Sequence, residues 1–315
     1  MKTIAIVFPA SIGDVINASP VCVELKNKYP DSKLVFITDP LGMQTAKCIP
    51  EVDEVITYDK AECKGLKLFK FALSIRLKEK IDLAVIIANS FRWAALAYLM
   101  GAKTRVGRDC QGRGFLLTHK IPRDYKADSH RSEYFMNILG PLNLCNPDYK
   151  LSFSYSEEDK NYIENLLENN NSLNYDLIGL CPCSRNEVKD WTIDEAAKFI
   201  DYINQNPNQK VALIGNKDVE KFSQQLKSMG VSDFLDLTCK TNIPQLGALI
   251  DRFKILITVD TGPAHIAYAL KKPSITLFFQ NIVNLWGPLN KDLNKVILSE
   301  NKDISHIVIS EFNSF

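Results

Sequence analysis

The sequence predicts an α/β protein that contains two doubly wound domains. Short β-branched runs alternate with longer amphipathic segments, and this series starts again midway along the chain. The apolar runs lack strict alternation, which is typical of parallel strands that helices cover on both faces. With 315 residues, the chain also has the length of two domains of about 150 residues each.

The predicted elements form two series. The predicted strands are Ile4–Phe8, Leu34–Thr38, Val55–Tyr58, Leu83–Ile87 and Arg105–Val106, and then Leu177–Leu180, Val211–Ile214, Phe234–Leu237, Ile255–Val259 and Ser274–Phe278. The predicted helices are Val15–Tyr29, Lys64–Lys80, Phe91–Met100 and His130–Leu139, and then Ile193–Gln205, Val219–Met229, Ile243–Asp251 and Pro263–Leu270. The spacing of Thr192 and Glu195 predicts a capping box at the start of the helix there.

A polar segment, Tyr155–Asn174, separates the two series and predicts a helix followed by a linker. The predicted division is a first domain at residues 1–155, a linker helix and loop at 156–174, and a second domain at 175–315. The last segment of the chain is a candidate to pack back on the first domain. Ligands of doubly wound sheets bind beyond the carboxyl ends of the strands, so we expect the site in a cleft between two facing domains.

The charge of the chain is unevenly placed. Residues 1–155 hold 22 Lys and Arg against 16 Asp and Glu, whereas the remaining residues hold 16 against 21. A basic half indicates an anionic partner, although charges scattered by chance over two solvated surfaces give the same count.

The start of the chain predicts a strand. Its short apolar run ends at Pro9, and a polar turn follows instead of a signal-peptide cleavage site. No run approaches the ~18 apolar residues of a spanning helix, so we expect a cytoplasmic protein. The eight cysteines are expected to be reduced, and the one cluster, Cys181-Pro182-Cys183, lacks the further ligands of a metal site.

The first chemical motif is Ser-Ile-Gly-Asp at residues 11–14, between the first predicted strand and the first predicted helix. Gly13 permits a tight turn and the close approach of a ligand. Asp14 would lie at the helix N-terminus, where it is either an N-cap or a general base that faces a ligand.

The second motif is Asp-Thr-Gly-Pro-Ala-His at residues 260–265, directly after the strand Ile255–Val259. Pro263 suits the first turn of a helix, and the preceding glycine lets backbone N–H groups and the positive helix end point at one anion. This is a diphosphate-binding geometry, although a simple capped turn has the same pattern. His265, one turn into the helix, would either reach a phosphate or pack under the loop.

The third motif, Lys189-Asp190-Trp191, follows the first strand of the second series. A lysine in this loop would neutralise charge that develops on a leaving phosphate. The alternative is a surface loop with one buried aromatic residue.

Together these motifs resemble the bacterial heptosyltransferase family of glycosyltransferases, family 9. The resemblance runs from Ile4 to about Pro288. The matching features are Ser11–Val15 with Pro20, Arg105-Val106-Gly107, His130, Lys189-x-Trp191, Leu213-Ile214-Gly215, Asp260–Ala267 running on to Pro273, Phe278 and Trp286-Gly287-Pro288.

The resemblance implies a GT-B fold, in which two Rossmann-like halves face the active site. It implies an inverting transfer of a heptose or related sugar from ADP-heptose to an acidic acceptor such as the lipopolysaccharide inner core. Neither a metal nor a cofactor is expected, and the chain contains no Asp-x-Asp metal clamp. The expected partners are the nucleotide sugar and an anionic glycolipid or oligosaccharide, not nucleic acid; a lipid-linked acceptor allows peripheral contact with the inner membrane surface.

The resemblance also implies residue roles. Asp14 falls on the catalytic base, Ser11 with Gly13 beside the donor, and Lys189 on the lysine that contacts the donor phosphates. The other implied donor contacts are Asp260, Thr261 and Gly262 at the ribose and diphosphate, Thr241 near the adenine, and Ser184 and His265. The acceptor-binding candidates are the basic-half residues Lys60, Lys64, Lys67, Arg105, Arg113 and His130, for which a solvated face is the alternative.

Two segments depart from the family pattern. The loop at residues 181–187 lacks the Gly-containing or Thr-rich form, and Phe279-Gln280-Asn281 replaces a glycine found after that strand in relatives. A transferase that uses another nucleotide sugar is therefore one alternative, and a non-catalytic binding protein of the same fold is a second. A nucleotide-dependent oxidoreductase is disfavoured because no Gly-x-Gly-x-x-Gly follows any predicted strand.

Overall fold

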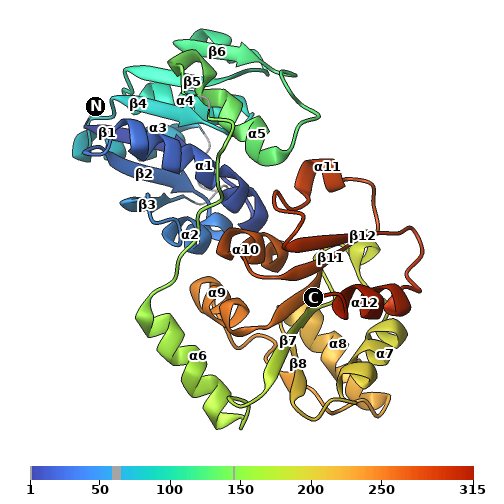
Figure 1. The fold of residues 1–315 in the computed structure, drawn as a ribbon. Helices are drawn as coiled ribbons and strands as arrows, with labels where there is room; N and C mark the ends of the chain where they lie inside the picture. The colour runs from blue at the N-terminus through green and yellow to red at the C-terminus, as the bar shows by residue number, and fades with distance from the viewer. Residues whose placement is uncertain (1, 59–64, 145) are drawn as a thin grey trace. The chain divides into compact units, whose positions relative to one another are not determined.

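The computed structural model describes residues 2–58, 65–144 and 146–315. The chain divides into two compact units, Met1–Phe153 and Ser154–Phe315 (Figure 1). Each unit contains its own parallel sheet and its own covering helices.

Unit 1 holds one six-stranded sheet. Its strands are β1 (Thr3–Val7), β2 (Lys33–Thr38), β3 (Glu54–Thr57), β4 (Leu83–Ile86), β5 (Thr104–Asp109) and β6 (His119–Pro122). Its helices are α1 (Ile12–Lys28), α2 (Pro40–Lys47), α3 (Leu66–Lys78), α4 (Phe91–Leu99) and α5 (Arg131–Met136), with the 3-10 turns η1 (Gly114–Leu116) and η2 (Asn137–Leu142).

Unit 2 repeats this plan. Its strands are β7 (Asp176–Cys181), β8 (Gln209–Leu213), β9 (Leu235–Asp236), β10 (Ile255–Val259), β11 (Ser274–Phe278) and β12 (Asn294–Leu298). Its helices are α6 (Glu157–Asn169), α7 (Ile193–Ile203), α8 (Lys217–Ser228), α9 (Ile243–Arg252), α10 (Gly262–Leu270), α11 (Val283–Trp286) and α12 (Ser305–Phe312), with the 3-10 turn η3 (Glu187–Lys189).

The two sheets have the same topology. The strand orders are β3-β2-β1-β4-β5-β6 and β12-β11-β10-β7-β8-β9, and every pairing is parallel. In both, the chain reverses its direction of travel across the sheet after the third strand, which creates a switch point between β1 and β4 and another between β7 and β10. The predicted α/β class with two Rossmann-like doubly wound halves is confirmed.

Helices cover both faces of each sheet. In unit 1, α1 packs with α2 and α5, whereas α3 packs with α4. In unit 2, α9 packs with α6 and α10, whereas α7 packs with α8 and α12. Right-handed crossovers place these two groups on opposite faces of a doubly wound sheet. The helix that the sequence assigns to a linker, α6, thus packs on α9.

The central strands form the cores. Every residue of β1 and of β10 is buried, since each of these strands has a neighbour on both sides and helices above and below. Of the strands at the sheet edges, β6 and β12 are partly exposed and carry polar residues such as His119 and Asn294. Without a continuous apolar run, the sequence does not predict them.

The segment Leu213-Ile214-Gly215 at the end of β8 closes on a glycine for a steric reason. Gly215 has a φ of +146°, and a Cβ there would approach the Val219 Cγ2 to 2.3 Å. Only glycine fits both the backbone angle and the space. None of the helices in the described segments combines the length and apolar character that crossing a bilayer requires.

The predicted capping box at Thr192 is wrong. Thr192 is the N-cap of α7, but its side chain makes no capping bond. Glu195 is instead buried and accepts hydrogen bonds from Lys198 and, at 2.8 Å, from the backbone N–H of Ser305 at the start of α12. The Glu195 carboxylate thus lies at the N-terminus of α12, where free N–H groups favour a negative charge.

We predict a pH-dependent loss of stability through Glu195. Burial alone would raise the pKa of Glu195, but the bonds from Lys198 and Ser305 lower it to about 2 from the ordinary value of 4.5. The lowered pKa stabilises the fold above pH 4.5, and this contribution is lost as the pH falls toward 2. At pH 7, E195Q should lower the free energy of unfolding by about 1–3 kcal/mol.

Urea unfolding at several pH values measures this effect. The difference between wild type and E195Q should shrink below pH 4.5, whereas E220Q, at an exposed position of α8, should match wild type throughout. A pH-independent difference would contradict the assignment.

Candidate functional site

The switch point of unit 2 brings a lysine and an aspartate together. Lys189 ends η3, in the loop that follows β7, and Asp260 directly follows β10, the neighbour of β7. The Lys189 Nζ lies 2.5 Å from the Asp260 Oδ2, and the two side chains are 24% and 8% exposed. The carboxylate thus fixes the ammonium at the ligand-binding edge of the sheet, and an ammonium has two further N–H donors for a ligand.

The N-terminus of α10 comes directly after Asp260 in the sequence. Thr261 is its N-cap, Gly262 begins the helix, and Pro263 occupies the first turn as predicted. The Ala264 N–H bonds the Thr261 carbonyl at 3.0 Å, but no group in the described part of the chain accepts from the N–H of Thr261 or Gly262. Two free amides, a helix N-terminus and a nearby ammonium form a site suited to a phosphate group.

His265 lies beneath this loop. It is 4% exposed, and its Nε2 is 3.9 Å from the Asp260 Oδ1. Its ring makes edge contacts with Tyr268 and Trp286, at centroid distances of 5.6 and 6.0 Å. The buried ring packs against these side chains, and a contact of His265 with a donor phosphate stays a prediction.

The loop between β7 and η3 is braced from within. The Ser184 N–H donates to the Asp190 Oδ1 at 2.6 Å, and the Ser184 hydroxyl donates to the Asn186 carbonyl at 2.9 Å. Trp191 is buried, and its backbone N–H donates to the Pro182 carbonyl at 2.9 Å. Burial raises the pKa of Cys181 to about 12, so this thiol is protonated at neutral pH.

The place of Thr241 follows from the order of the strands in unit 2. Thr241 precedes Asn242, the N-cap of α9, in the segment after β9. Because β9 is an edge strand, Thr241 follows a strand two places from β7, whereas Lys189 and Asp260 follow adjacent strands.

Within the described residues there is no group of three or more His, Cys, Asp or Glu side chains that could hold a metal ion.

In unit 1 the switch point carries Asp14. α1 begins at Ile12, three residues earlier than predicted, so Ser11 is the N-cap and Asp14 is the third helical residue. Gly13 is therefore a buried helical residue and not part of a turn, and the alternative of Asp14 as an N-cap is wrong. The half-buried Asp14 carboxylate accepts from the Ser11 hydroxyl at 2.7 Å and from its N–H at 3.4 Å, both at Oδ2. Nothing in the described residues donates to Oδ1.

Two polar residues that the sequence does not single out, Asn17 and Ser132, support the first turn of α1. The Asn17 Nδ2 donates to the Gly13 carbonyl at 2.8 Å, and the Ser132 hydroxyl donates to the Asn17 Oδ1 at 2.8 Å. Both side chains are buried, so they link the first turns of α1 and α5. A single Asn or Ser in a helical pattern gives no signal of such a partner, since the bond spans 115 residues.

The structure separates the acceptor candidates. Lys67 is exposed on α3, and His130 is the N-cap of α5, where its Nδ1 accepts from the Ser132 N–H at 3.2 Å. Lys60 and Lys64 lie outside the described residues.

The two arginine candidates bond to backbone carbonyls. The Arg105 Nε donates to Leu116 at 2.6 Å and its Nη1 to Ala102 at 2.5 Å. Arg113 is completely buried and donates to the carbonyls of Ala88, Ser90 and Arg108, the last at 2.8 Å. Burial lowers the pKa of Arg113. Both side chains hold loops in place, and Arg113 has no surface of its own to offer a ligand in this structure.

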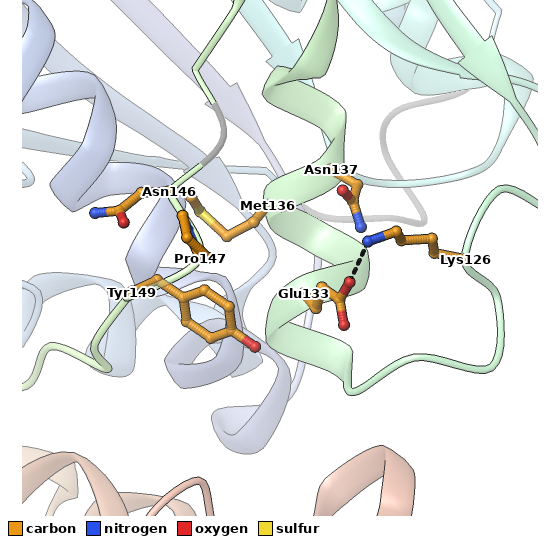
Figure 2. A pocket seen from close by; sticks show the side chains of 7 residues that line it. All are labelled: Lys126, Glu133, Met136, Asn137, Asn146, Pro147 and Tyr149. Carbon is orange, nitrogen blue, oxygen red and sulfur yellow. Dashed lines mark hydrogen bonds and ion pairs between the residues drawn. The ribbon is translucent and has the colours of Figure 1, made fainter.

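A cavity of about 390 Å³ lies elsewhere in unit 1 (Figure 2). The Lys126 Nζ and the Glu133 Oε1, 2.5 Å apart, form an ion pair on one side of it. Its lining residues are Lys126, Glu133, Met136, Asn137, Asn146, Pro147 and Tyr149, and they include none of the sequence-predicted site residues.

Comparison with known proteins gives a consistent result. The model of glycosyltransferase family 9 (heptosyltransferase) matches residues 70–309. The chain is 26% identical to lipopolysaccharide heptosyltransferase 3 of Escherichia coli, over 95% of this chain and 92% of that protein. It is also 26% identical to lipopolysaccharide core heptosyltransferase OpsX of Haemophilus influenzae, over 95% and 85%.

Two solved structures have the same fold. The E. coli ADP-heptose lipopolysaccharide heptosyltransferase II is similar with a TM-score of 0.85 and 23% identity, over 100% of this chain and 98% of that one. The E. coli heptosyltransferase WaaC with ADP has a TM-score of 0.78 and 17% identity, over 99% of both chains. These similarities confirm the predicted GT-B fold class.

We predict that Lys189 and Asp260 are energetically coupled. K189M should lower the free energy of unfolding by about 3 kcal/mol, because it removes the ammonium that neutralises the buried Asp260 carboxylate. The double variant K189M/D260N should be more stable than K189M, which gives a coupling energy of about 1–3 kcal/mol.

Urea unfolding of the four proteins of this cycle measures the coupling. The matched control is K254M, which breaks the pair between Lys254 and Asp176, two side chains that are each 56% exposed. It should cost less than about 1 kcal/mol. The coupling is absent if the effects of K189M and D260N on the free energy of unfolding simply add in the double variant.

Proposed function

The chain belongs to glycosyltransferase family 9 (heptosyltransferase), and on that premise we propose a specific reaction for it. The donor is ADP-heptose, the acceptor is an anionic saccharide of the lipopolysaccharide inner core, and the sugar is transferred in one inverting displacement. Residues 1–155 bind the acceptor and residues 175–315 bind the donor. The observation that carries the proposal is the Lys189–Asp260 pair beside the free amides at the start of α10.

The donor part of the proposal rests on charge. When the bond between the anomeric carbon and the diphosphate breaks, negative charge grows on the departing phosphate oxygen. The Lys189 ammonium and the Thr261 and Gly262 amides would meet this charge, together with the positive end of α10. In this scheme no metal ion is needed, and Asp260 keeps the ammonium in place between turnovers. Ser184 and Thr241 would contact the rest of the donor.

Names of similar structures support ADP-heptose as the donor. The E. coli heptosyltransferase WaaC was solved with ADP and with ADP-2-deoxy-2-fluoro heptose. We extend this donor to the present chain because Lys189 and the α10 amides would bind the same diphosphate.

The acceptor part rests on Asp14. An acceptor hydroxyl attacks the anomeric carbon, and its proton passes to the carboxylate, which acts as a general base. The Ser11 hydroxyl holds Oδ2 at 2.7 Å, which leaves Oδ1 open for that proton. A single displacement inverts the configuration at the anomeric carbon.

The remaining assignments follow from the same scheme. Lys67 and His130 would contact anionic groups of the acceptor, whereas Arg105 and Arg113 would shape the loops around it. The reaction needs no cofactor besides the nucleotide sugar. It would take place in the cytoplasm, with peripheral contact to the inner membrane surface that carries the acceptor.

We predict that D14N abolishes transfer but keeps donor binding. The amide cannot accept the proton, so kcat should fall by about 10²–10⁴-fold, while the affinity for ADP stays unchanged. Transfer from ADP-heptose to a lipopolysaccharide core acceptor measures kcat, and calorimetry measures ADP binding. D31N, at an exposed position of unit 1, should behave as wild type. Full activity of D14N would refute the role of Asp14.

We also predict a preference for ADP among nucleotide diphosphates. ADP should raise the melting temperature more than UDP, GDP or CDP. The shift is measurable, because a ligand at 100 times its Kd stabilises a protein by about 2.7 kcal/mol. K189A should lose most of this shift, and K221A, an exposed lysine of α8, should keep it.

The other outcomes identify the alternatives. A larger shift with UDP, GDP or CDP would indicate another nucleotide sugar, which the departure at residues 279–281 allows. A shift with ADP-heptose but no transfer to any acceptor would indicate a non-catalytic binding protein.

A further inference from the structure

Helix α3 has a second apolar side that the fold does not use. Leu68, Ala72 and Ile75 face the core and are buried. The side chains of the other apolar stripe are exposed: Leu66 by 71%, Phe69 by 47%, Leu73 by 39% and Leu77 by 78%.

These four residues lie on one side of the helix. Their spacings of three, four and four residues keep them in a single stripe along α3, because a helix turns once in about 3.6 residues. Single exposed leucines are common on protein surfaces, but four large apolar side chains in a helical row are not. The stripe therefore requires an explanation beyond chance exposure.

The charged residues of α3 itself have one sign. α3 contains Lys67, Lys70, Arg76 and Lys78, all exposed, and no acidic residue. About 100° of rotation per residue places Lys70 on one side of the stripe and Arg76 on the other. Glu79, the C-cap, bonds Lys33, so its charge is already compensated.

The body of unit 1 is contacted by the other side of the helix. α3 packs on α4, and the Phe71 ring lies 5.8 Å from the ring of Tyr58. The exposed stripe is displaced from these contacts by roughly half a turn. A partner for it must therefore come from outside the described part of unit 1, and it must tolerate cations on both sides of an apolar row.

We propose that α3 docks this protein on an anionic lipid surface. Leu66, Phe69, Leu73 and Leu77 enter the boundary between headgroups and acyl chains, and Lys70, Arg76 and Lys78 bind the phosphates of the headgroups. A basic helix with a bulky apolar stripe is the pattern of helices that lie in the membrane plane, and each Lys or Arg near an anionic surface strengthens the attraction. The central part of a protein–protein interface, by contrast, is depleted of charged residues.

This inference deepens the proposed function, because a lipid-linked acceptor is carried on such a surface. Its measurement needs neither donor nor acceptor. Loss of ADP binding or of transfer would count against the proposed function, whereas loss of vesicle binding counts only against the role of α3.

Vesicle co-sedimentation of the full chain tests the proposal. The protein should bind vesicles of phosphatidylcholine with phosphatidylglycerol at least about 10-fold more tightly than phosphatidylcholine alone, and high salt should weaken the binding. L66S/L73S/L77S should lose binding by about 10-fold or more, since each exposed leucine contributes apolar area to the membrane contact. K70Q/R76Q/K78Q should lose the preference for the anionic vesicles.

A matched control separates the helix from general surface hydrophobicity. L41S/L289S/L298S replaces three other exposed leucines and should bind vesicles as wild type does. A far-UV circular dichroism spectrum and a cooperative thermal transition like those of the wild type show that each variant is folded.

A direct measurement places the stripe in the lipid. In F69W, lipids brominated on their acyl chains should quench the fluorescence of the introduced tryptophan. The same vesicles should leave L298W unquenched.

Two results would overturn the proposal. One is wild-type binding by the L66S/L73S/L77S variant. The other is concentration-dependent dimerisation of the wild type, without vesicle binding, that this variant abolishes; the stripe would then join two copies of the chain.

Discussion

Parallel strands in a doubly wound sheet all deliver their carboxyl ends to one edge, and the site in unit 2 depends on this constraint. Lys189 and Asp260 are 71 residues apart in the sequence, yet their charged atoms lie 2.5 Å apart. They meet because β7 and β10 are neighbours at the switch point, where the two chain directions leave a gap between the following loops. The α10 amides reach the same edge because their helix starts directly after β10.

A carboxylate inside the proposed anion site is a compromise that the geometry explains. Asp260 reduces the net positive charge that a phosphate would meet, but it also restricts a long, flexible side chain to one position. A lysine loses considerable rotamer entropy when a ligand immobilises it, and prior fixation reduces that cost at the moment of binding. Ser11 acts in a similar way on Asp14, since one hydroxyl bond orients the carboxylate and leaves its other oxygen open.

The basic character of unit 1 is distributed differently from what its composition suggests. Arg108 and Arg113 are completely buried, and their guanidinium groups bond to backbone carbonyls instead of carboxylates. These carbonyls belong to the segments after β4 and β6, to β5 and to α5, so both arginines brace the segments at the carboxyl ends of these strands. The exposed cations of α3, by contrast, surround an apolar stripe. The excess of basic residues therefore serves partly as internal bracing and partly as surface charge.

The sequence by itself determined the central strands and the motifs at their ends. The predicted bounds Ile255–Val259 and Ser274–Phe278 agree with β10 and β11, because a buried strand needs a continuous apolar run and the chain shows that run locally. Only the tertiary structure decided which polar groups pair. Glu195 accepts from the N-terminus of α12 instead of capping its own helix, α7, and Asn17 pairs with Ser132. The edge strands β6 and β12 form because a neighbouring strand offers free backbone groups. These pairings join segments far apart in the chain, so no local pattern of residues encodes them.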